Sequence, residues 1–267
     1  MKRICIFLFS GTGMTKYIVD KMKTEFVKQQ AHLDVFPIED VQAKSISLIP
    51  YDGVGIAYPV HAFNAPKIVV DFARQLPDVA GINTFVISTA GDPHPLNLAS
   101  SNLLMKTLCK KGFHVFYDQQ FIMPSNFIIK DDEAKVQGKL SKANSEISTT
   151  VQEILNRVAL KQKSSLIAKI VAVLGRAEWV GLKCARFLRA DTSCERCGIC
   201  VAKCPNSNIS ISKGRVAFGW HCGLCMRCFY LCPVNAVKIC WPFGFIGFDS
   251  WYEDEELSVK RFADWQL

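Results

Sequence analysis

The sequence predicts a doubly wound α/β domain of five parallel strands, followed by a small cysteine-rich domain. Strand-like apolar runs alternate with helix-like segments over residues 1–160. Eight of the twelve cysteines then lie between 194 and 232. The 267 residues are enough for one large domain or two small ones. A hydrophobic fraction of 49% with 21% charged residues excludes disorder of the whole chain.

The pattern of apolar residues defines each element of the first domain. Residues 3–9 form a continuous apolar run, which is typical of a strand buried on both faces. Apolar residues at helical spacing follow over 15–29, and 32–38 alternates like a strand. Continuing in this way, we expect strands at 3–9, 32–38, 53–58, 84–89 and 113–123, with helices at 15–29, 66–76, 96–111 and 131–160.

The remaining residues divide into three segments. Residues 161–190 are expected to form a basic amphipathic helix, with Leu166, Ile170 and Val173 on one face and Lys169, Arg176 and Lys183 on another. This helix is either a packed linker or a docking site for anionic lipid, as a peripheral membrane contact, or for an acidic partner. Residues 191–240 form the cysteine domain, and 241–267 form an aromatic, then acidic tail without an assigned fold.

Charge and hydropathy narrow the functional classes. The net charge of +8 is uneven, because residues 157–189 carry eight Lys or Arg and one acid, whereas 249–264 carry six acids and two bases. A nucleic-acid binder needs a sustained basic surface, so this class is excluded. No apolar stretch approaches 18 residues, so no transmembrane helix is expected. The apolar N-terminus ends at a glycine loop rather than a cleavage site, which predicts a cytoplasmic protein.

The cysteines form two copies of the pattern C-x2-C-x2-C-x3-C-P, separated by one constant offset along the chain. Three thiolates two residues apart can hold three corners of an iron cube, and in two-cluster proteins the fourth binds the other cube. One 4Fe–4S cluster is therefore assigned to Cys194, Cys197, Cys200 and Cys232, and a second to Cys222, Cys225, Cys228 and Cys204. Zinc ribbons instead use two widely separated CxxC pairs. This segment of about 50 residues resembles bacterial-type ferredoxins with two 4Fe–4S clusters, which implies a small α+β domain.

The loop after the first strand is predicted to bind phosphate. It reads Ser10-Gly11-Thr12-Gly13-Met14-Thr15 and matches neither the GxGxxG dinucleotide pattern nor the GxxxxGK phosphate loop. It is a hydroxyl-rich turn leading into a helix N-terminus, where backbone N–H groups and hydroxyls can surround a phosphate.

Two further loops are expected beside it, because the loops after strands one, three and four meet at the switch point of such a sheet. They contain Tyr58, Pro59, Val60, His61, Ala62, Phe63 and Asn64, and then Thr89, Ala90, Gly91 and Asp92. The first offers aromatic surface, and the second offers a glycine where backbone could approach a flat ring. Three questions stay open. Tyr58 either caps the sheet or contacts the ring. His61 is a surface residue, or it contacts the ring or relays protons, and Asp92 is either a turn residue or an acid near the ring.

The pattern S-x-T-G-x-T after an N-terminal strand resembles flavodoxins over roughly residues 1–160. The resemblance implies a flavodoxin-like fold and FMN, with the phosphate on Ser10–Thr15 and the isoalloxazine between the 58–64 and 89–92 loops. Together the two halves resemble flavodoxin–ferredoxin fusion proteins of anaerobic bacteria and archaea.

The function expected from these features is electron transfer between FMN and two 4Fe–4S clusters, with no residue acting as nucleophile or acid. The expected partners are redox proteins, either a ferredoxin-type donor or reductase or an acceptor enzyme, and a homodimer stays open. The alternative is an FMN-dependent reductase of a small molecule, with protons supplied by His61 or Asp92. No nicotinamide-binding module is recognisable, which favours a protein donor.

Overall fold

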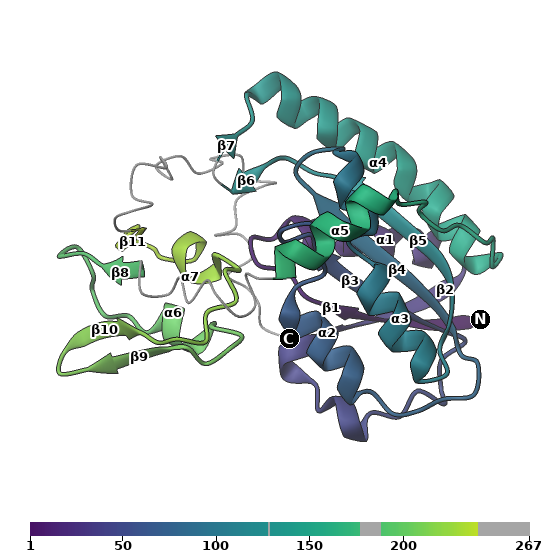
Figure 1. Ribbon diagram of the computed structural model, residues 1–267, viewed down its shortest axis with the longest axis horizontal. Helices are drawn as coiled ribbons and strands as arrows, with labels where there is room; N and C mark the ends of the chain where they lie inside the picture. Colours follow the sequence, from purple (N-terminus) through teal and green to yellow (C-terminus); the bar gives the residue numbers. More distant parts are fainter. Residues whose placement is uncertain (128, 177–187, 240–267) are drawn as a thin grey trace. The chain divides into compact units, whose positions relative to one another are not determined.

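The computed structural model describes residues 1–127, 129–176 and 188–239 (Figure 1). The chain separates into two compact units, a sheet unit that includes the first part of the predicted linker and a cysteine-rich unit. The predicted tail at 241–267 and the linker positions 177–187 lie outside the described residues.

The sheet unit is built on five parallel strands in the order β2-β1-β3-β4-β5 (Figure 1). This is the flavodoxin-like doubly wound order, with its switch point between β1 and β3, and it confirms the predicted fold class. The strands are β1 (Lys2–Leu8), β2 (Ala31–Pro37), β3 (Gly53–Pro59), β4 (Asn83–Ala90) and β5 (His114–Ile122).

Burial on both faces explains the continuous apolar run of β1, in which five of seven residues are buried. The sheet is close-packed at its centre, where a Cβ on Gly55 would lie 2.5 Å from the ring of Phe85. Only glycine fits between β1 and β4 at this position of β3.

Helices cover both faces of the sheet. Helix α1 packs beside α4 and α2 packs beside α3, as Figure 1 shows. The helices are α1 (Met14–Lys28), α2 (Lys67–Gln75), α3 (Asn102–Lys110), α4 (Glu133–Leu155) and α5 (Leu166–Gly175), with 3₁₀ turns η1 (Ile38–Asp40), η2 (Ala43–Ser45) and η3 (Pro95–Ala99). In the described ranges we find no helix with the length and apolar character needed to cross a bilayer.

Two predicted helices differ from the observed ones because of tertiary contacts. The helix expected at 96–111 is broken between η3 and α3, where the Ser100 carbonyl accepts a hydrogen bond from the Ala65 amide at 2.9 Å. The helix expected at 131–160 ends at Leu155, and Arg157 adopts a left-handed φ of 56°. Leu160 then bridges to the edge strand β5, where its carbonyl accepts from the Asp118 amide at 2.8 Å. This pairing covers an edge that would otherwise expose backbone donors and acceptors.

A short hairpin that the sequence pattern did not predict lies between β5 and α4. It consists of β6 (Asn126–Phe127) and β7 (Ile129–Lys130). Helix α4 begins directly after it, and the Asp132 carboxylate caps the helix by accepting from the Lys135 amide at 2.9 Å.

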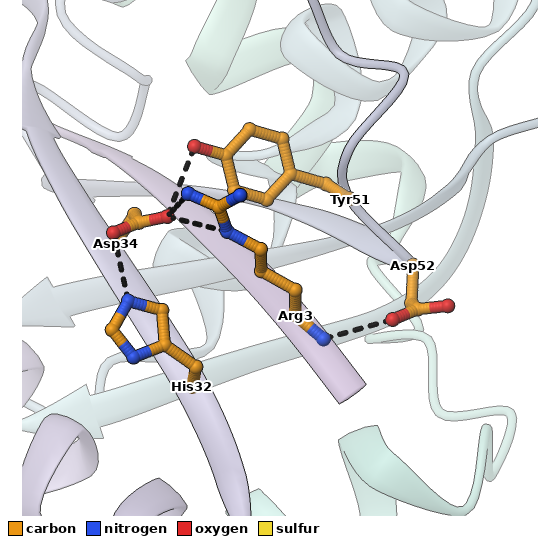
Figure 2. A network of polar contacts seen from close by, with 5 residues as sticks. All are labelled: Arg3, His32, Asp34, Tyr51 and Asp52. Carbon is orange, nitrogen blue, oxygen red and sulfur yellow. Dashed lines mark hydrogen bonds and ion pairs between the residues drawn. The ribbon is translucent and has the colours of Figure 1, made fainter. Parts of the chain in front are cut away.

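A polar network fastens the outer strand β2 to the rest of the sheet (Figure 2). The Asp34 carboxylate accepts from the Arg3 guanidinium at 3.0 Å, from the Tyr51 hydroxyl at 3.0 Å and bonds the His32 ring at 2.9 Å. Burial alone would raise the pKa of Asp34, but the hydrogen bonds from His32, Tyr51 and Arg3 outweigh it and hold the pKa below its ordinary value. This carboxylate therefore stays ionised and joins β1, β2 and Tyr51, which lies two residues before β3.

The cysteine-rich unit is a small α+β structure, as predicted. Strand β8 pairs with β11 and β9 pairs with β10, both antiparallel. The elements are β8 (Leu188–Ala190), α6 (Ile199–Ala202), β9 (Ile209–Ser212), β10 (Arg215–Phe218), α7 (Arg227–Tyr230) and β11 (Val237–Ile239). Its buried apolar cluster contains Leu188, Met226, Phe229, Tyr230, Leu231 and Val237.

The internal repeat of the sequence is also a repeat of backbone structure. Helices α6 and α7 begin and end at equivalent positions of the two cysteine runs, and both follow a residue with left-handed φ, Gly198 at 79° and Met226 at 59°. Strands β9 and β11 likewise begin at equivalent positions of the repeat, Ile209 and Val237. Each cysteine run therefore forms the same turn and short helix.

Candidate functional site

The three predicted loops of the sheet unit meet at the carboxyl ends of their strands, and Thr89 joins them. Its hydroxyl bonds the Thr15 hydroxyl at the start of α1 at 2.8 Å, and its carbonyl accepts from the Val60 amide at 2.8 Å. This arrangement follows from the strand order, because β1, β3 and β4 are neighbours at the switch point.

The first loop has the conformation of an anion site at a helix N-terminus. Ser10 is buried, and its hydroxyl accepts from the Lys16 amide in the first turn of α1 at 3.3 Å. Gly13 takes a positive φ of 94°, which lets the chain turn sharply into the helix. The first turn of α1 contains no acidic residue, so no carboxylate competes for the positive end of the helix dipole. A phosphate group fits this donor set.

The second loop contains a strained turn held by one asparagine. His61 and Asn64 exchange backbone hydrogen bonds of 2.9 and 2.8 Å, and both intervening residues, Ala62 and Phe63, have positive φ. Such conformations persist in non-glycine residues only where the surroundings hold them. The Asn64 amide donates to the Ala62 carbonyl at 2.9 Å and to the Ala172 carbonyl of α5 at 2.7 Å. This turn presents Ala62 and Phe63 at the edge of the loop.

The predicted ring-contacting residues do not all lie at the surface of the loops. Tyr58 is fully buried on β3, with its hydroxyl beside Ser100, and burial raises its pKa well above the ordinary value. Of the two roles that the sequence left open for Tyr58, this burial favours capping the sheet. His61 keeps partial exposure beside the Phe9 ring, 6.4 Å away between centroids. Desolvation lowers the pKa of His61 to about 4, so its imidazole is neutral near pH 7.

The third loop is fixed from outside by a lysine that sequence reasoning missed. Lys139 on α4 donates to the Gly91 carbonyl at 2.6 Å. The neighbouring Asp92 side chain is exposed, and its carbonyl accepts from the Asn97 side-chain amide at 2.9 Å. Asp92 thus takes part in a turn, whereas Lys139 places a cation beside the loop.

A buried carboxyl lies behind the loops and was also missed. Asp118 on β5 is 1% exposed and accepts from the Ser101 hydroxyl at 2.6 Å. Burial raises the pKa of Asp118 to about 6, although the Ser101 hydrogen bond opposes the shift. The polar run Asp118-Gln119-Gln120 inside an otherwise apolar strand was the sequence signal for this group.

The cysteine-rich unit gathers its cysteines in two separate pockets. One pocket is lined by Cys222, Cys225 and Cys228 together with Cys204. The other is lined by Cys194, Cys197 and Cys200 together with Cys232. Each pocket therefore combines three cysteines of one run with the fourth cysteine of the other. None of the eight takes part in a disulfide.

The pockets are poor environments for isolated thiolates. Desolvation raises the pKa of Cys228 well above its ordinary value, and the neighbours Cys225, Cys222 and Cys204 raise it further. The pKa of Cys200 is raised in the same way, by desolvation and by Cys194, Cys197 and Cys232. Anionic sulfur here needs a positively charged group among the cysteines, and iron ions supply such charge.

The two fourth cysteines receive matched backbone hydrogen bonds. The Asn208 amide donates to Cys204 Sγ at 3.3 Å, and the Ala236 amide donates to Cys232 Sγ at 3.1 Å. Both the donors and the acceptors occupy equivalent positions of the repeat. Such bonds stabilise anionic sulfur and tune the potential of an iron–sulfur cluster.

Among the described side chains, no group of three His, Cys, Asp or Glu is placed to hold a metal ion.

The two pockets differ in one buried cation. Arg227 is 4% exposed, lines the pocket of Cys222, Cys225 and Cys228, and donates to the Lys203 carbonyl at 3.3 Å. The equivalent position of the other run is Ile199. The pocket of Cys194, Cys197 and Cys200 is lined instead by the exposed charges of Glu195 and Arg196. The two pockets are therefore electrostatically unequal.

Solved structures similar to this chain include flavodoxins. Oxidised flavodoxin 2 from Bacillus cereus matches with 15% identity over 59% of this chain and 99% of its own, at a TM-score of 0.45. General stress protein 14 from Treponema denticola, solved in complex with FMN, matches with 12% identity over 58% and 99%, at 0.41. A variant of flavodoxin from Pseudomonas aeruginosa matches with 10% identity over 57% and 99%, at 0.43. No protein-family model matches this chain, and no curated protein matches it.

The raised pKa of Asp118 leads to a prediction about stability. Asp118 holds its proton more tightly in the folded state than in the unfolded state. The free energy of unfolding therefore falls as pH rises from the unfolded pKa of roughly 4 to the folded pKa of about 6. Asp118→Asn removes this cost. The variant is expected to be the more stable protein at pH 8, with its advantage smaller by about 1 kcal/mol at pH 5.5.

Denaturant unfolding of both proteins across this pH range measures the difference. The exposed Asp92→Asn serves as the control and should leave the profile unchanged. A constant difference between Asp118→Asn and the wild type at all pH values would contradict a buried titrating carboxyl.

Proposed function

We propose that this protein transfers electrons between FMN on the sheet unit and two 4Fe–4S clusters in the cysteine-rich unit. The observation that carries the proposal is the pair of four-cysteine pockets, each drawing its fourth cysteine from the other run. This is the arrangement expected of two-cluster ferredoxins. Bound FMN would accept one or two electrons and each cluster one, so that the protein could exchange single electrons for pairs.

The chain's own residues have distinct roles in this proposal. The Ser10–Thr15 loop and the N-terminus of α1 bind the FMN phosphate, since the loop turns at Gly13 and no acid lies in the first helical turn. The edge of the ring-binding site is formed by the strained turn at Ala62 and Phe63 and by the loop at Ala90 and Gly91. Tyr58 is fully buried on β3 and takes no part in ring binding in this proposal.

In the cysteine-rich unit the thiolates bind iron and the backbone tunes it. The amides of Asn208 and Ala236 stabilise the negative charge on Cys204 and Cys232. The burial around Cys228 would keep water from a bound cluster, and this would strengthen the effect of nearby charge on it.

A carrier of electrons between proteins fits these residues better than a reductase of a small molecule. The reductase alternative needs a proton donor at the loops, and a histidine with a pKa of about 4 is already deprotonated near pH 7. Asp92 is a poor candidate for this donor, because its side chain is exposed and its backbone takes part in a turn. The partners are therefore proposed to be a ferredoxin-type donor or reductase and an acceptor enzyme.

Cofactor content tests the proposal directly. Anaerobically purified protein should contain about eight irons, eight acid-labile sulfides and one FMN per chain. Metal, sulfide and flavin analyses measure these. Zinc in place of iron, or absence of flavin from protein with full iron content, would exclude electron transfer between FMN and the clusters.

Crossed ligation makes a second prediction, for which the repeat offers a matched pair of variants. Cys204→Ala should damage the cluster of Cys222, Cys225 and Cys228, whereas Cys232→Ala should damage that of Cys194, Cys197 and Cys200. Paramagnetic resonance of the reduced proteins distinguishes the two clusters. If Cys204→Ala instead removed the signal of the Cys194–Cys200 cluster, each run would bind its own fourth cysteine.

The unequal pockets make a third prediction. The positive charge of a guanidinium favours the more negative, reduced cluster beside it. Arg227→Met is therefore expected to lower the potential of the cluster at Cys222, Cys225 and Cys228 by tens of mV, on the order set by a nearby unit charge. Arg227→Lys should retain most of the potential.

Redox titration followed by paramagnetic resonance measures both potentials. Ile199→Arg is the reciprocal variant, because Ile199 is 37% exposed and can accept a longer side chain. It should raise the potential of the other cluster. Potentials unchanged in both variants at full iron content would mean that this cation does not distinguish the clusters.

A further inference from the structure

Helix α5 is apolar on every side. Of its ten residues, Leu166–Gly175, only Lys169 is polar. Five large aliphatic side chains are exposed: Leu166 by 72%, Ile167 by 68%, Ile170 by 52%, Val173 by 57% and Leu174 by 67%. A helix that is hydrophobic all round is normally buried, in a protein core or in lipid. These five side chains form an exposed patch of the kind that marks an interaction site.

The inward face of α5 fixes this orientation. Ala168 and Ala172 are fully buried against Ala99 and Leu96 of η3. A Cβ on Gly175 would lie 2.3 Å from the Ala62 carbonyl oxygen, so larger residues cannot replace this glycine. The sequence pattern placed Leu166, Ile170 and Val173 on one apolar face and left open whether that face packs or docks. In the structure the small residues pack and these three face outward. The helix cannot roll to bury them, because only small side chains allow this close approach.

Helical geometry places the aliphatic patch directly opposite the packed face. At about 100° per residue, Ala168 and Ala172 lie on one side, and Leu166, Ile170 and Val173 lie on the other. The most outward part of the helix is therefore aliphatic, where a helix facing only water carries polar residues.

Cations border the patch without acids among them. Lys161 and Lys163 are exposed just before the helix, and Lys169 is exposed along it. Arg176 follows directly, half-buried, with its Nε donating to the Asn64 side-chain oxygen at 3.1 Å. No Asp or Glu occurs from 157 to 176. An aliphatic face bordered by Lys and Arg is the pattern of helices that lie in the surface of an anionic bilayer.

We infer that α5 binds an anionic membrane surface, lying in its plane with the aliphatic patch at the acyl boundary and the lysines among the headgroups. A second copy of this chain is a poorer occupant, because pairing two patches brings the same cations together. Since Asn64 and Gly175 hold α5 on the turn at 61–64, binding would bring the carboxyl edge of the sheet to the membrane. The inference does not depend on the proposed cofactors.

Vesicle flotation of the full-length protein, purified anaerobically with its native cofactors, tests this inference. The protein is expected to bind vesicles of phosphatidylglycerol and phosphatidylcholine, and to bind phosphatidylcholine alone much more weakly. Ile170→Glu with Val173→Glu should lower vesicle binding more than tenfold, because two aliphatic side chains that enter the bilayer surface are lost. Ile49→Glu is the matched control, since Ile49 is 94% exposed outside α5, and its binding should equal the wild type.

The lysines are tested separately from the patch. Lys161→Ala with Lys163→Ala should lower binding to the anionic vesicles by about fivefold for each cation, and leave binding to neutral vesicles unchanged. Circular dichroism confirms that the variants are folded.

Three results would overturn the inference. Wild-type protein that floats with neither vesicle has no membrane site, and equal binding by Ile170→Glu with Val173→Glu places the site elsewhere. A dimer in light scattering that these two substitutions dissociate, without vesicle binding, would identify a second copy as the occupant.

Discussion

The arrangement of the sheet unit depends on the switch in strand order between β1 and β3. The hydroxyls of Thr15 and Thr89 form a hydrogen bond at this switch. Parallel strands with right-handed crossovers send helices to opposite faces on either side of β1 and β3. Their carboxyl ends therefore open toward one place. Thr89 also accepts from the Val60 amide, so that one residue of β4 links the loops after β1 and β3. The Ser10–Thr15 loop and the strained turn are held in register by the sheet that precedes them.

The cysteine-rich unit depends on a different balance. Among its described residues the buried apolar cluster contains six, and an apolar core of this size stabilises a small domain only weakly. Burial also makes its thiols resist ionisation, as the raised pKa values of Cys200 and Cys228 indicate. Metal binding would offset both the small core and the resistance of the thiols to ionisation, because it cross-links the two runs and stabilises the thiolates. The internal repeat then serves folding and function at once, since neither run completes a pocket alone.

The packing of α5 connects the strained loop to the outer surface. The same asparagine that holds Ala62 and Phe63 at positive φ donates to the α5 backbone. Close approach at Gly175 leaves no room for a larger side chain. The consequence is a helix whose small residues face the protein and whose large residues face outward, which is the reverse of ordinary core packing.

The alternation of strands and helices, the parallel sheet and the repeated structure of the two cysteine runs could all be predicted from the sequence. These features are local, because burial on both faces produces a continuous apolar run in β1 and because the turn of each cysteine run is encoded within the run itself. The loop positions at Ser10–Thr15, 58–64 and 89–92 followed from the strand ends. Tertiary contacts were needed to show that Tyr58 is buried, that Asp118 is a buried acid and that the helix expected at 96–111 is broken where the Ser100 carbonyl accepts from the Ala65 amide. They also select which side of α5 packs. Periodicity reveals that a helix has faces, but the face that packs is selected by the space its neighbours leave, and here that space admits only alanine and glycine.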